Sequence, residues 1–181
     1  MNRKLFLSLA ICLLLVGTAQ ADLKLVDTGQ PSNTTGGMGL VYPQTLLAQF
    51  VLNQPAIVTS IQGWVNVTHA GNMSVQIYRD NGDVPGAFVT SQMLTVATTG
   101  ASWVGATSLN WPLRAGTYWV GFWGSMIFDG TMPGPAPAPL GKEGYINPSG
   151  TPFVRADSMD IGVKINGNPV TNPNLLLLLS Q

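Results

Sequence analysis

The nine residues from Gly116 to Gly124 constrain the fold more than any other stretch of the chain. They read Gly-Thr-Tyr-Trp-Val-Gly-Phe-Trp-Gly and place four aromatic side chains in nine positions. Successive side chains of a β-strand point to opposite faces. One face would carry Tyr118, Val120 and Phe122, and the other Trp119, Gly121 and Trp123. We therefore expect a central strand of a β-sheet here, with the first of these faces in the core.

Similar runs of alternating apolar and polar residues, separated by turn residues at intervals of roughly ten, occur along the chain. They predict strands at Leu23–Val26, Thr45–Leu52, Ile57–Thr68, Asn72–Arg79, Ala87–Ala97, Trp103–Trp111 and Met159–Ile165. His69-Ala70-Gly71 is expected to join the third and fourth of these as a hairpin. Loops are predicted at Gly29–Gly39 and at the proline-rich segment Met132–Leu140, and a polar, turn-rich segment at Lys142–Phe153.

Once the first residues are set aside, no helical periodicity extends over about 11 residues or more. Eight or nine strands with turn signals between them indicate an all-β fold. We expect an antiparallel two-sheet sandwich of the jelly-roll type.

Residues 1–21 have the features of a cleaved signal peptide. They comprise a basic start at Asn2-Arg3-Lys4, an apolar core from Leu5 to Val16 and a cleavage signal at Ala19-Gln20-Ala21. Cleavage after Ala21 would leave one sandwich domain at 22–170, followed by a tail at 171–181, and the protein would be secreted. The five leucines of that tail are far fewer than the roughly 20 apolar residues that span a bilayer, so we expect no stable membrane span in the mature chain.

The charge and cysteine content of the mature chain exclude several classes of protein. Arg3 and Lys4 would leave with the signal peptide, so six basic residues would remain against eight acidic ones. This balance provides no basic patch for nucleic acid or for anionic lipid. The only cysteine, Cys12, lies within 1–21, which excludes a disulfide-stapled scaffold and a cysteine nucleophile.

The sequence identifies no set of catalytic residues. His69 is the only histidine and falls in a predicted turn, so a Ser-His-Asp triad would have to be built on it. A cryptic hydrolase of that kind would lose its activity in His69→Ala. We expect no enzyme activity and no cofactor.

Asp80, Asn81 and Asp83 are the one weak candidate for a metal site. Their oxygen atoms could ligate Ca²⁺, but the segment lacks the full ligand pattern of a calcium-binding loop and its terminal Glu. The alternative is an Asn-Gly hairpin turn in which the Asp side chains cap backbone N–H groups. This alternative explains the same residues more simply.

Three tryptophans fall opposite the aliphatic faces of their predicted strands. Trp64, Trp119 and Trp123 would lie beside polar side chains that include Gln62 and Asn66. Indole rings next to amide groups can stack on sugars and also hydrogen-bond to them. These five residues are therefore a candidate glycan-binding face. The alternative is that the tryptophans lie in the core or under loops, with the proline-rich segment as the cover.

Several short segments occur in a characteristic order between about Leu25 and Val170. They are Ala48-Gln49-Phe50, Ile61-Gln62-Gly63-Trp64, Ile77-Tyr78-Arg79-Asp80 with Pro85-Gly86, Trp103-Val104-Gly105, Leu113 to Val120, and Met132-Pro133-Gly134-Pro135. In this combination the chain resembles secreted bacterial β-sandwich domains of PEP-CTERM (exosortase-sorted) and choice-of-anchor surface proteins. The resemblance implies export to the cell surface or its exopolysaccharide and no defined activity. The chain departs from it at Leu175 to Leu179, where a complete sorting anchor would be expected.

From these observations we expect a non-enzymatic, secreted protein of the cell surface or extracellular matrix, with a structural, adhesive or binding role. The alternative is a carbohydrate-binding module for extracellular polysaccharide or surface glycans. The two hypotheses differ in whether Trp64, Trp119 and Trp123 are coplanar and exposed.

Overall fold

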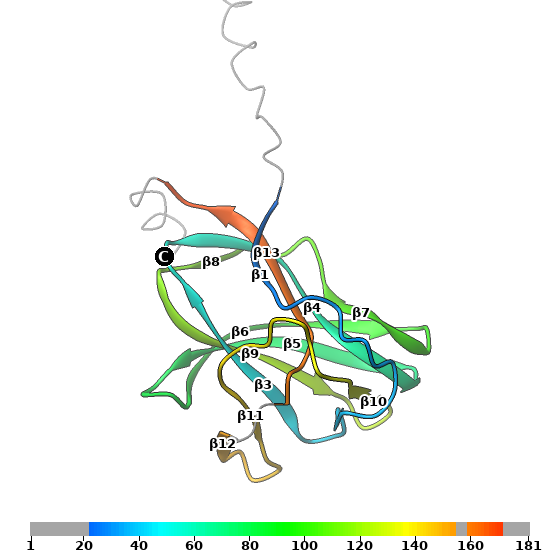
Figure 1. Ribbon diagram of the computed structural model, residues 1–181. Helices are drawn as coiled ribbons and strands as arrows, with labels where there is room; N and C mark the ends of the chain where they lie inside the picture. The colour runs from blue at the N-terminus through cyan, green and yellow to red at the C-terminus, as the bar shows by residue number, and fades with distance from the viewer. Residues whose placement is uncertain (1–21, 155–158, 172–181) are drawn as a thin grey trace, which may run out of the picture.

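The computed structural model describes residues 22–154 and 159–171, which form two antiparallel β-sheets packed face to face (Figure 1). This part of the chain contains thirteen strands and no helix. The expected all-β, two-sheet sandwich is confirmed, and the jelly-roll arrangement remains a prediction. The predicted signal peptide at 1–21 and the tail after Thr171 lie outside the described residues.

The first sheet is built around β4 (Ala56–His69), the longest strand. On one side of β4 lie β13 (Val163–Pro169) and β10 (Asp129–Met132), and on the other lie β7 (Gly100–Ala106) and β8 (Trp111–Leu113). The strand β1 (Leu23–Asp27) extends the sheet beyond β13, and β2 (Met38–Gly39) extends it beyond β10. The single strand predicted at Trp103–Trp111 is thus divided between β7 and β8.

The second sheet has six strands. Their order is β12 (Pro152–Val154), β11 (Glu143–Ile146), β3 (Thr45–Leu52), β9 (Gly116–Gly124), β5 (Gly71–Asp80) and β6 (Pro85–Val96). The aromatic strand β9 lies inside this sheet, as expected, and pairs with β3 on one side and β5 on the other. Both β3 and β9 have the bounds that the sequence predicts.

The inner faces of the two sheets form one apolar core. From β9, Tyr118, Val120 and Phe122 are at most 2% exposed, as predicted. The ring of Phe50 stacks on Tyr118 with centroids 5.8 Å apart, and the Tyr118 hydroxyl donates to the backbone oxygen of Arg114 at 3.1 Å. The one polar atom of this buried ring is therefore paired. Removal of this apolar surface from water is the main force that holds the sheets together.

The predicted hairpin between Ile57–Thr68 and Asn72–Arg79 is wrong. These segments form β4 and β5, which belong to different sheets and do not pair with each other. The alternation in Asn72–Arg79, in which Met73, Val75 and Ile77 are the apolar members expected to point inward, nevertheless predicted the buried face correctly, because all three are fully buried. Alternation shows which side chains face the core but not which strand lies alongside. The short connection instead crosses between the sheets at one end of the sandwich.

Two predictions for the C-terminal part of the chain also need correction. The segment Lys142–Phe153 contains β11 and β12, which pair with each other. The last strand begins at Val163, later than predicted, because Glu143 binds the residues before it. This side chain is 1% exposed, and its carboxylate accepts backbone hydrogen bonds from Met159, from Asp160 at 2.6 Å and from Ile161 at 2.9 Å. Those N–H groups are therefore not free to pair in a strand.

A hairpin turn joins β5 and β6, as the sequence predicts, but Asn81 and Gly82 are not its two central residues. Gly82 and Asp83 occupy its two central positions with φ of +65° and +69°. The N–H of Asn81 donates to the backbone oxygen of Val84 at 2.9 Å. Two-residue hairpin turns of this kind need positive φ at both central positions, which glycine and aspartate tolerate.

Candidate functional site

Trp64 lies on β4 and is covered by loops. Its side chain is 6% exposed, and its indole N–H donates to the backbone oxygen of Asn33 at 3.2 Å. The Asn33 amide in turn donates to the backbone oxygen of Gly134, in the proline-rich loop, at 2.6 Å. Trp103 packs edge-on against Trp64, with ring centroids 5.5 Å apart. The indole donor that a sugar would need is thus already paired within the protein.

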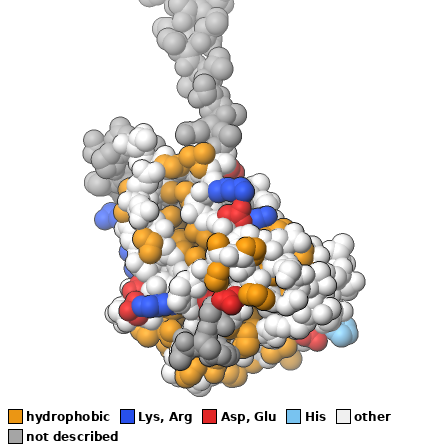
Figure 2. All heavy atoms as spheres, viewed as in Figure 1, with side chains coloured by type: hydrophobic (Ala, Val, Ile, Leu, Met, Phe, Trp, Pro, Cys, Tyr) orange, Lys and Arg blue, Asp and Glu red, His pale blue; other side chains and the backbone are white. Residues whose placement is uncertain are grey.

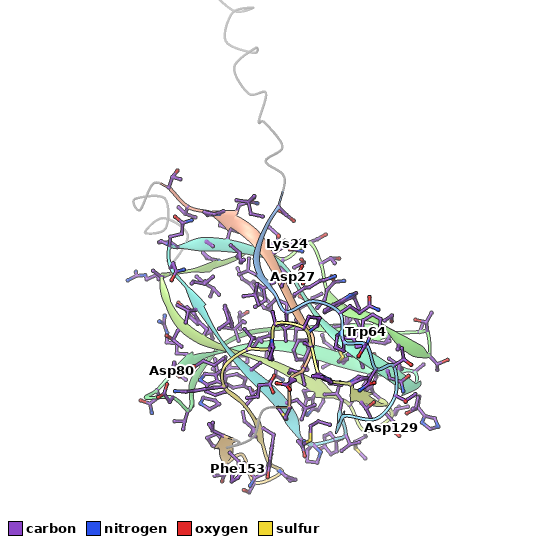
Figure 3. The ribbon with its side chains drawn as sticks, viewed as in Figure 1. Lys24, Asp27, Trp64, Asp80, Asp129 and Phe153 are labelled. Carbon is purple, nitrogen blue, oxygen red and sulfur yellow. The ribbon has the colours of Figure 1, made fainter. Side chains whose placement is uncertain are left out.

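Trp119 lies on β9, in the second sheet, and is fully buried. Its indole N–H donates to a carboxylate oxygen of Asp80 at 2.8 Å, and the Gln49 amide donates to the same oxygen at 2.8 Å. In the view of Figure 3, Asp80 and Trp64 lie toward opposite sides of the molecule. The structure therefore does not bring Trp64 and Trp119 together on one face.

Trp123 is the only one of the three tryptophans that is not buried. It lies near the end of β9, and Tyr42 packs edge-on against it with ring centroids 5.8 Å apart. Gln62 and Asn66 are half-buried on β4, in the other sheet. The five residues predicted as a glycan-binding face are therefore divided between two sheets.

The carboxylates of the predicted metal candidate are engaged by protein groups. Asp80 accepts a third hydrogen bond, from the N–H of Asp83 at 3.1 Å, and the Asp83 carboxylate forms an ion pair with Lys142. Partial burial acts to raise the pKa of Asp80, but hydrogen bonds from Asp83, Trp119 and Gln49 outweigh it and lower the pKa. The hydrogen bond from Lys142 lowers the pKa of Asp83. Within the part of the chain that the structure describes, no three His, Cys, Asp or Glu residues are placed to hold a metal ion.

An open hollow of about 440 Å³ lies at the end of the sandwich where β4 turns into β5. We call it the end hollow, and its lining residues are Val41, Tyr42, His69, Met126, Ile127, Phe128 and Asp129. Four of these side chains are both apolar and exposed, namely Val41, Tyr42, Met126 and Ile127. Figure 2 shows the single histidine at the margin of the molecule next to an acidic side chain, which marks the position of this end.

A tight turn from Ser125 to Phe128 supplies the most exposed side chains of the end hollow. The N–H of Phe128 donates to the backbone oxygen of Ser125 at 3.1 Å. The N–H of Ser125 donates to the backbone oxygen of Asn72 at 2.9 Å. The two central positions hold Met126 and Ile127, which are 80% and 78% exposed. Turns usually place glycine or polar residues there. Burial within the protein therefore does not explain these two apolar side chains.

Phe128 anchors this turn to the sandwich. Its side chain is 2% exposed and lies against Gly71, Gly124 and Gly130. A Cβ at Gly71 would lie 2.8 Å from the backbone nitrogen of Phe128, and a Cβ at Gly124 would lie 2.7 Å from its ring. Only residues without a Cβ allow the backbone to approach so closely. The turn is thus held at its base while its tip stays in solvent.

His69 and Asp129 are the polar members of the end hollow. They are opposite each other in the pairing of β4 with β10, and Nδ1 of His69 lies 3.6 Å from a carboxylate oxygen of Asp129. Both side chains are largely exposed, so their remaining nitrogen and oxygen atoms can bind a ligand. Among the described residues, no serine hydroxyl hydrogen-bonds to His69, so the geometry does not assemble the triad considered for this histidine.

The sequence analysis did not identify Tyr42, Met126 or Ile127 as site residues. A signal for two of them is nevertheless present in the sequence. Met126 and Ile127 lie between Gly124-Ser125 and Asp129-Gly130, which are turn-forming residues. Apolar residues within a predicted turn are candidates for exposed contact residues. The position of Tyr42 beside Trp123 could not be predicted, because it depends on how the loop before β3 folds back.

No protein-family model matches this chain, nor does any curated protein. No helix within residues 22–154 and 159–171 is long and apolar enough to cross a membrane.

Proposed function

We propose that this protein is a non-enzymatic, secreted module of the cell surface or extracellular matrix that contacts its partner through the end hollow. One observation carries the proposal: the Ser125–Phe128 turn keeps Met126 and Ile127 80% and 78% exposed, beside Tyr42. Grouped apolar side chains on a surface mark interaction sites. Loops held by a rigid scaffold are a common location for such sites. The proposed role is adhesive or structural.

Export is part of the proposal and rests on the predicted signal peptide at 1–21. Cleavage after Ala21 would leave Asp22 as the first residue of the mature chain. The Asp22 carboxylate accepts hydrogen bonds from the Thr59 hydroxyl at 2.8 Å and from the Asn168 amide at 3.2 Å. These two hydrogen bonds hold Asp22 against β4 and β13 of the first sheet. The resemblance to PEP-CTERM and choice-of-anchor proteins favours the same location.

Retention on cells tests the proposal. Purified protein is added to washed cells of the strain that produces it, and the fraction that sediments with the cells is measured. Replacing Met126 and Ile127 together by serine should lower retention at least about tenfold, because each buried aliphatic side chain contributes roughly 1.5–3 kcal/mol. The control variant is Val51→Ser with Phe153→Ser, which removes two apolar side chains elsewhere that are also more than half exposed. Equal retention of the Met126/Ile127 variant and the wild type would contradict the proposed site.

Extracellular polysaccharide is a second candidate ligand. The aromatic pair of Tyr42 and Trp123 borders a hollow that also carries His69 and Asp129. Aromatic rings can stack on sugar rings while the imidazole and carboxylate hydrogen-bond to hydroxyl groups. Trp64 and Trp119 have no part in this version, because their indole donors are paired inside the protein.

A pull-down with exopolysaccharide from the producing strain tests the second candidate. Tyr42→Ala should lower the bound fraction about tenfold, because it removes one stacking surface. Phe88→Ala is the matched control, since Phe88 is 56% exposed and lies on β6, away from the end hollow. Binding by Tyr42→Ala that equals wild-type binding would exclude the hollow as a sugar site.

A further inference from the structure

The strand β6 is an unusually long free edge. It comprises twelve residues, Pro85–Val96, and is the last strand of the second sheet, where β5 is its only ladder partner among the described residues. At the other edge of the same sheet, β12 has only three residues and begins with Pro152. Short strands and prolines protect sheet edges from pairing with other chains. The strand β6 is long, and its only proline is its first residue, Pro85, so it lacks both of these protections over the rest of its length.

The pairing of β5 shows which backbone groups of β6 face outward. The backbone oxygen of Asn72 accepts from Ser125, which follows β9, so Asn72 points its polar groups toward β9. Because these groups alternate along a strand, Met73 and Val75 point theirs toward β6. Their partners are Leu94 and Gln92, which therefore bond to β5. The N–H and C=O groups of the intervening residues Ser91, Met93 and Thr95 must face away from the sheet.

A side-chain contact leads independently to the same assignment. The amide nitrogen of Gln92 donates to the backbone oxygen of Met93 at 2.9 Å. An oxygen that points away from β5 is far more accessible to such a donor than one that points between the two strands, so the contact agrees with this assignment. The Met93 carbonyl therefore lies on the free edge.

The edge is also regular and uncharged. The two irregularities in the β5–β6 register fall before Thr90, so Thr90–Val96 pairs with β5 without a bulge. No Lys, Arg, Asp or Glu occurs in Pro85–Val96, and charges are the commonest protection of an edge strand. Phe88 and Met93 are 56% and 51% exposed on this strand. Two such edges brought together would place no like charges opposite each other.

We infer that β6 pairs with β6 of a second copy of this chain, antiparallel and centred on Met93. A two-fold axis at Met93 places the outward N–H of each Met93 opposite the outward oxygen of the other. Ser91 of each copy then faces Thr95 of the other, and the second sheet continues across the pair as a single sheet. The hydrogen bond from the Gln92 amide to the Met93 oxygen is replaced by one from the Met93 N–H of the second copy. Because a single strand of each copy takes part in this pairing, we expect a weak dimer, with a dissociation constant of about 1–100 µM.

The mass of the purified protein measured by light scattering during gel filtration, over a range of concentrations, tests this inference. The wild type should pass from monomer to dimer as its concentration rises. Met93→Pro removes one outward N–H and no bond to β5, and prolines are accepted on edge strands in this orientation. It should weaken dimerisation at least tenfold. Met93→Thr is the matched control, because it removes the same side chain, keeps the N–H and retains a good strand former.

Three results would overturn the inference. They are a wild type that stays monomeric up to about 1 mM, dimerisation of Met93→Pro equal to that of the wild type, and a loss of dimer in Met93→Thr as large as in Met93→Pro. The third result would show that the Met93 side chain, and not its backbone N–H, makes the dimer contact. If circular dichroism shows that Met93→Pro does not fold, Met93→Lys replaces it. Two lysines would then be opposite each other at the axis, so a dimer of unchanged strength would contradict β6 pairing.

Discussion

At the scale of single residues, several carboxylates of this protein act as hydrogen-bond acceptors within the fold. Asp80 accepts from an indole, an amide and a backbone N–H, and Glu143 accepts from three successive backbone N–H groups. Hydrogen bonds to a charged acceptor are stronger than those between neutral groups. These side chains therefore join segments that lie far apart in the sequence, such as β5 with β9.

The lowered pKa of Asp80 predicts a pH dependence of stability. A carboxyl group with a lowered pKa in the folded state stabilises the fold above its unfolded pKa of about 3.9, and this contribution disappears as the pH falls through the lowered value. We expect the free energy of unfolding to decrease below about pH 4, and to decrease less steeply in Asp80→Asn. Urea denaturation at a series of pH values measures both slopes. Val51→Ser, which removes no carboxylate, is the control, and an equally steep fall in Asp80→Asn would contradict the prediction.

Glu143 allows a second test at this scale. Glu143→Ala leaves three backbone N–H groups, one buried and two partly buried, without this acceptor, so the free energy of unfolding should fall by about 3 kcal/mol. Glu143→Gln keeps one acceptor oxygen at nearly the same size and should cost less. Chemical denaturation of both variants measures the difference. Equal destabilisation by alanine and glutamine would show that the acceptor oxygens are not what matters.

At the scale of strands and turns, the sequence predicted which face of a strand is buried better than it predicted which strands pair. Alternation identified the core-facing side chains of β5 and β9, because period two follows directly from strand geometry, but it did not identify Trp119, which is buried on the opposite face of β9. It could not show that β4 and β5 lie in different sheets, since both hairpins and sheet crossings use short connections. It also missed β11 and β12, where few apolar residues occur and a buried carboxylate, Glu143, organises the segment.

The candidate site was harder to predict for the same reason. In the sequence, Trp64 and Trp119 fall opposite the aliphatic faces of their strands, as the residues of an exposed binding face would. In the structure, loops and neighbouring side chains cover both. Such cover comes from segments distant in sequence, including Asn33 and Asp80. Only Trp123 remains partly exposed, in edge-on contact with Tyr42 of the end hollow. Of the three tryptophans in the predicted glycan-binding face, only Trp123 therefore remains available to contact a sugar.

The glycines around Phe128 give a prediction about the Ser125–Phe128 turn. Gly71→Ala would place a Cβ 2.8 Å from the backbone nitrogen of Phe128, so the turn must shift or the fold must strain. We expect a loss of about 1–3 kcal/mol in unfolding free energy. Gly141→Ala is the matched control, because nothing lies within 4 Å of the added Cβ. Thermal and urea denaturation compare the two, and equal stability would contradict the packing described for Phe128.

At the scale of the whole molecule, one core serves both sheets, so the sandwich should unfold as a unit. Buried tryptophans report from each sheet, Trp64 from the first and Trp119 from the second. We expect Trp64→Phe and Trp119→Phe to give fluorescence transitions that each coincide with the far-ultraviolet circular dichroism transition of the same variant. Two separate midpoints within one variant would show that the sheets unfold independently.

The way Phe128 holds its turn separates the demands of folding from those of recognition. The ring and its three glycines fix the position of the turn, while the neighbouring Met126 and Ile127 contribute little to the packed interior. Substitutions at these two positions should therefore leave stability almost unchanged. These two positions can therefore be varied at little cost to the scaffold, which makes the Ser125–Phe128 turn a suitable place to graft binding sequences.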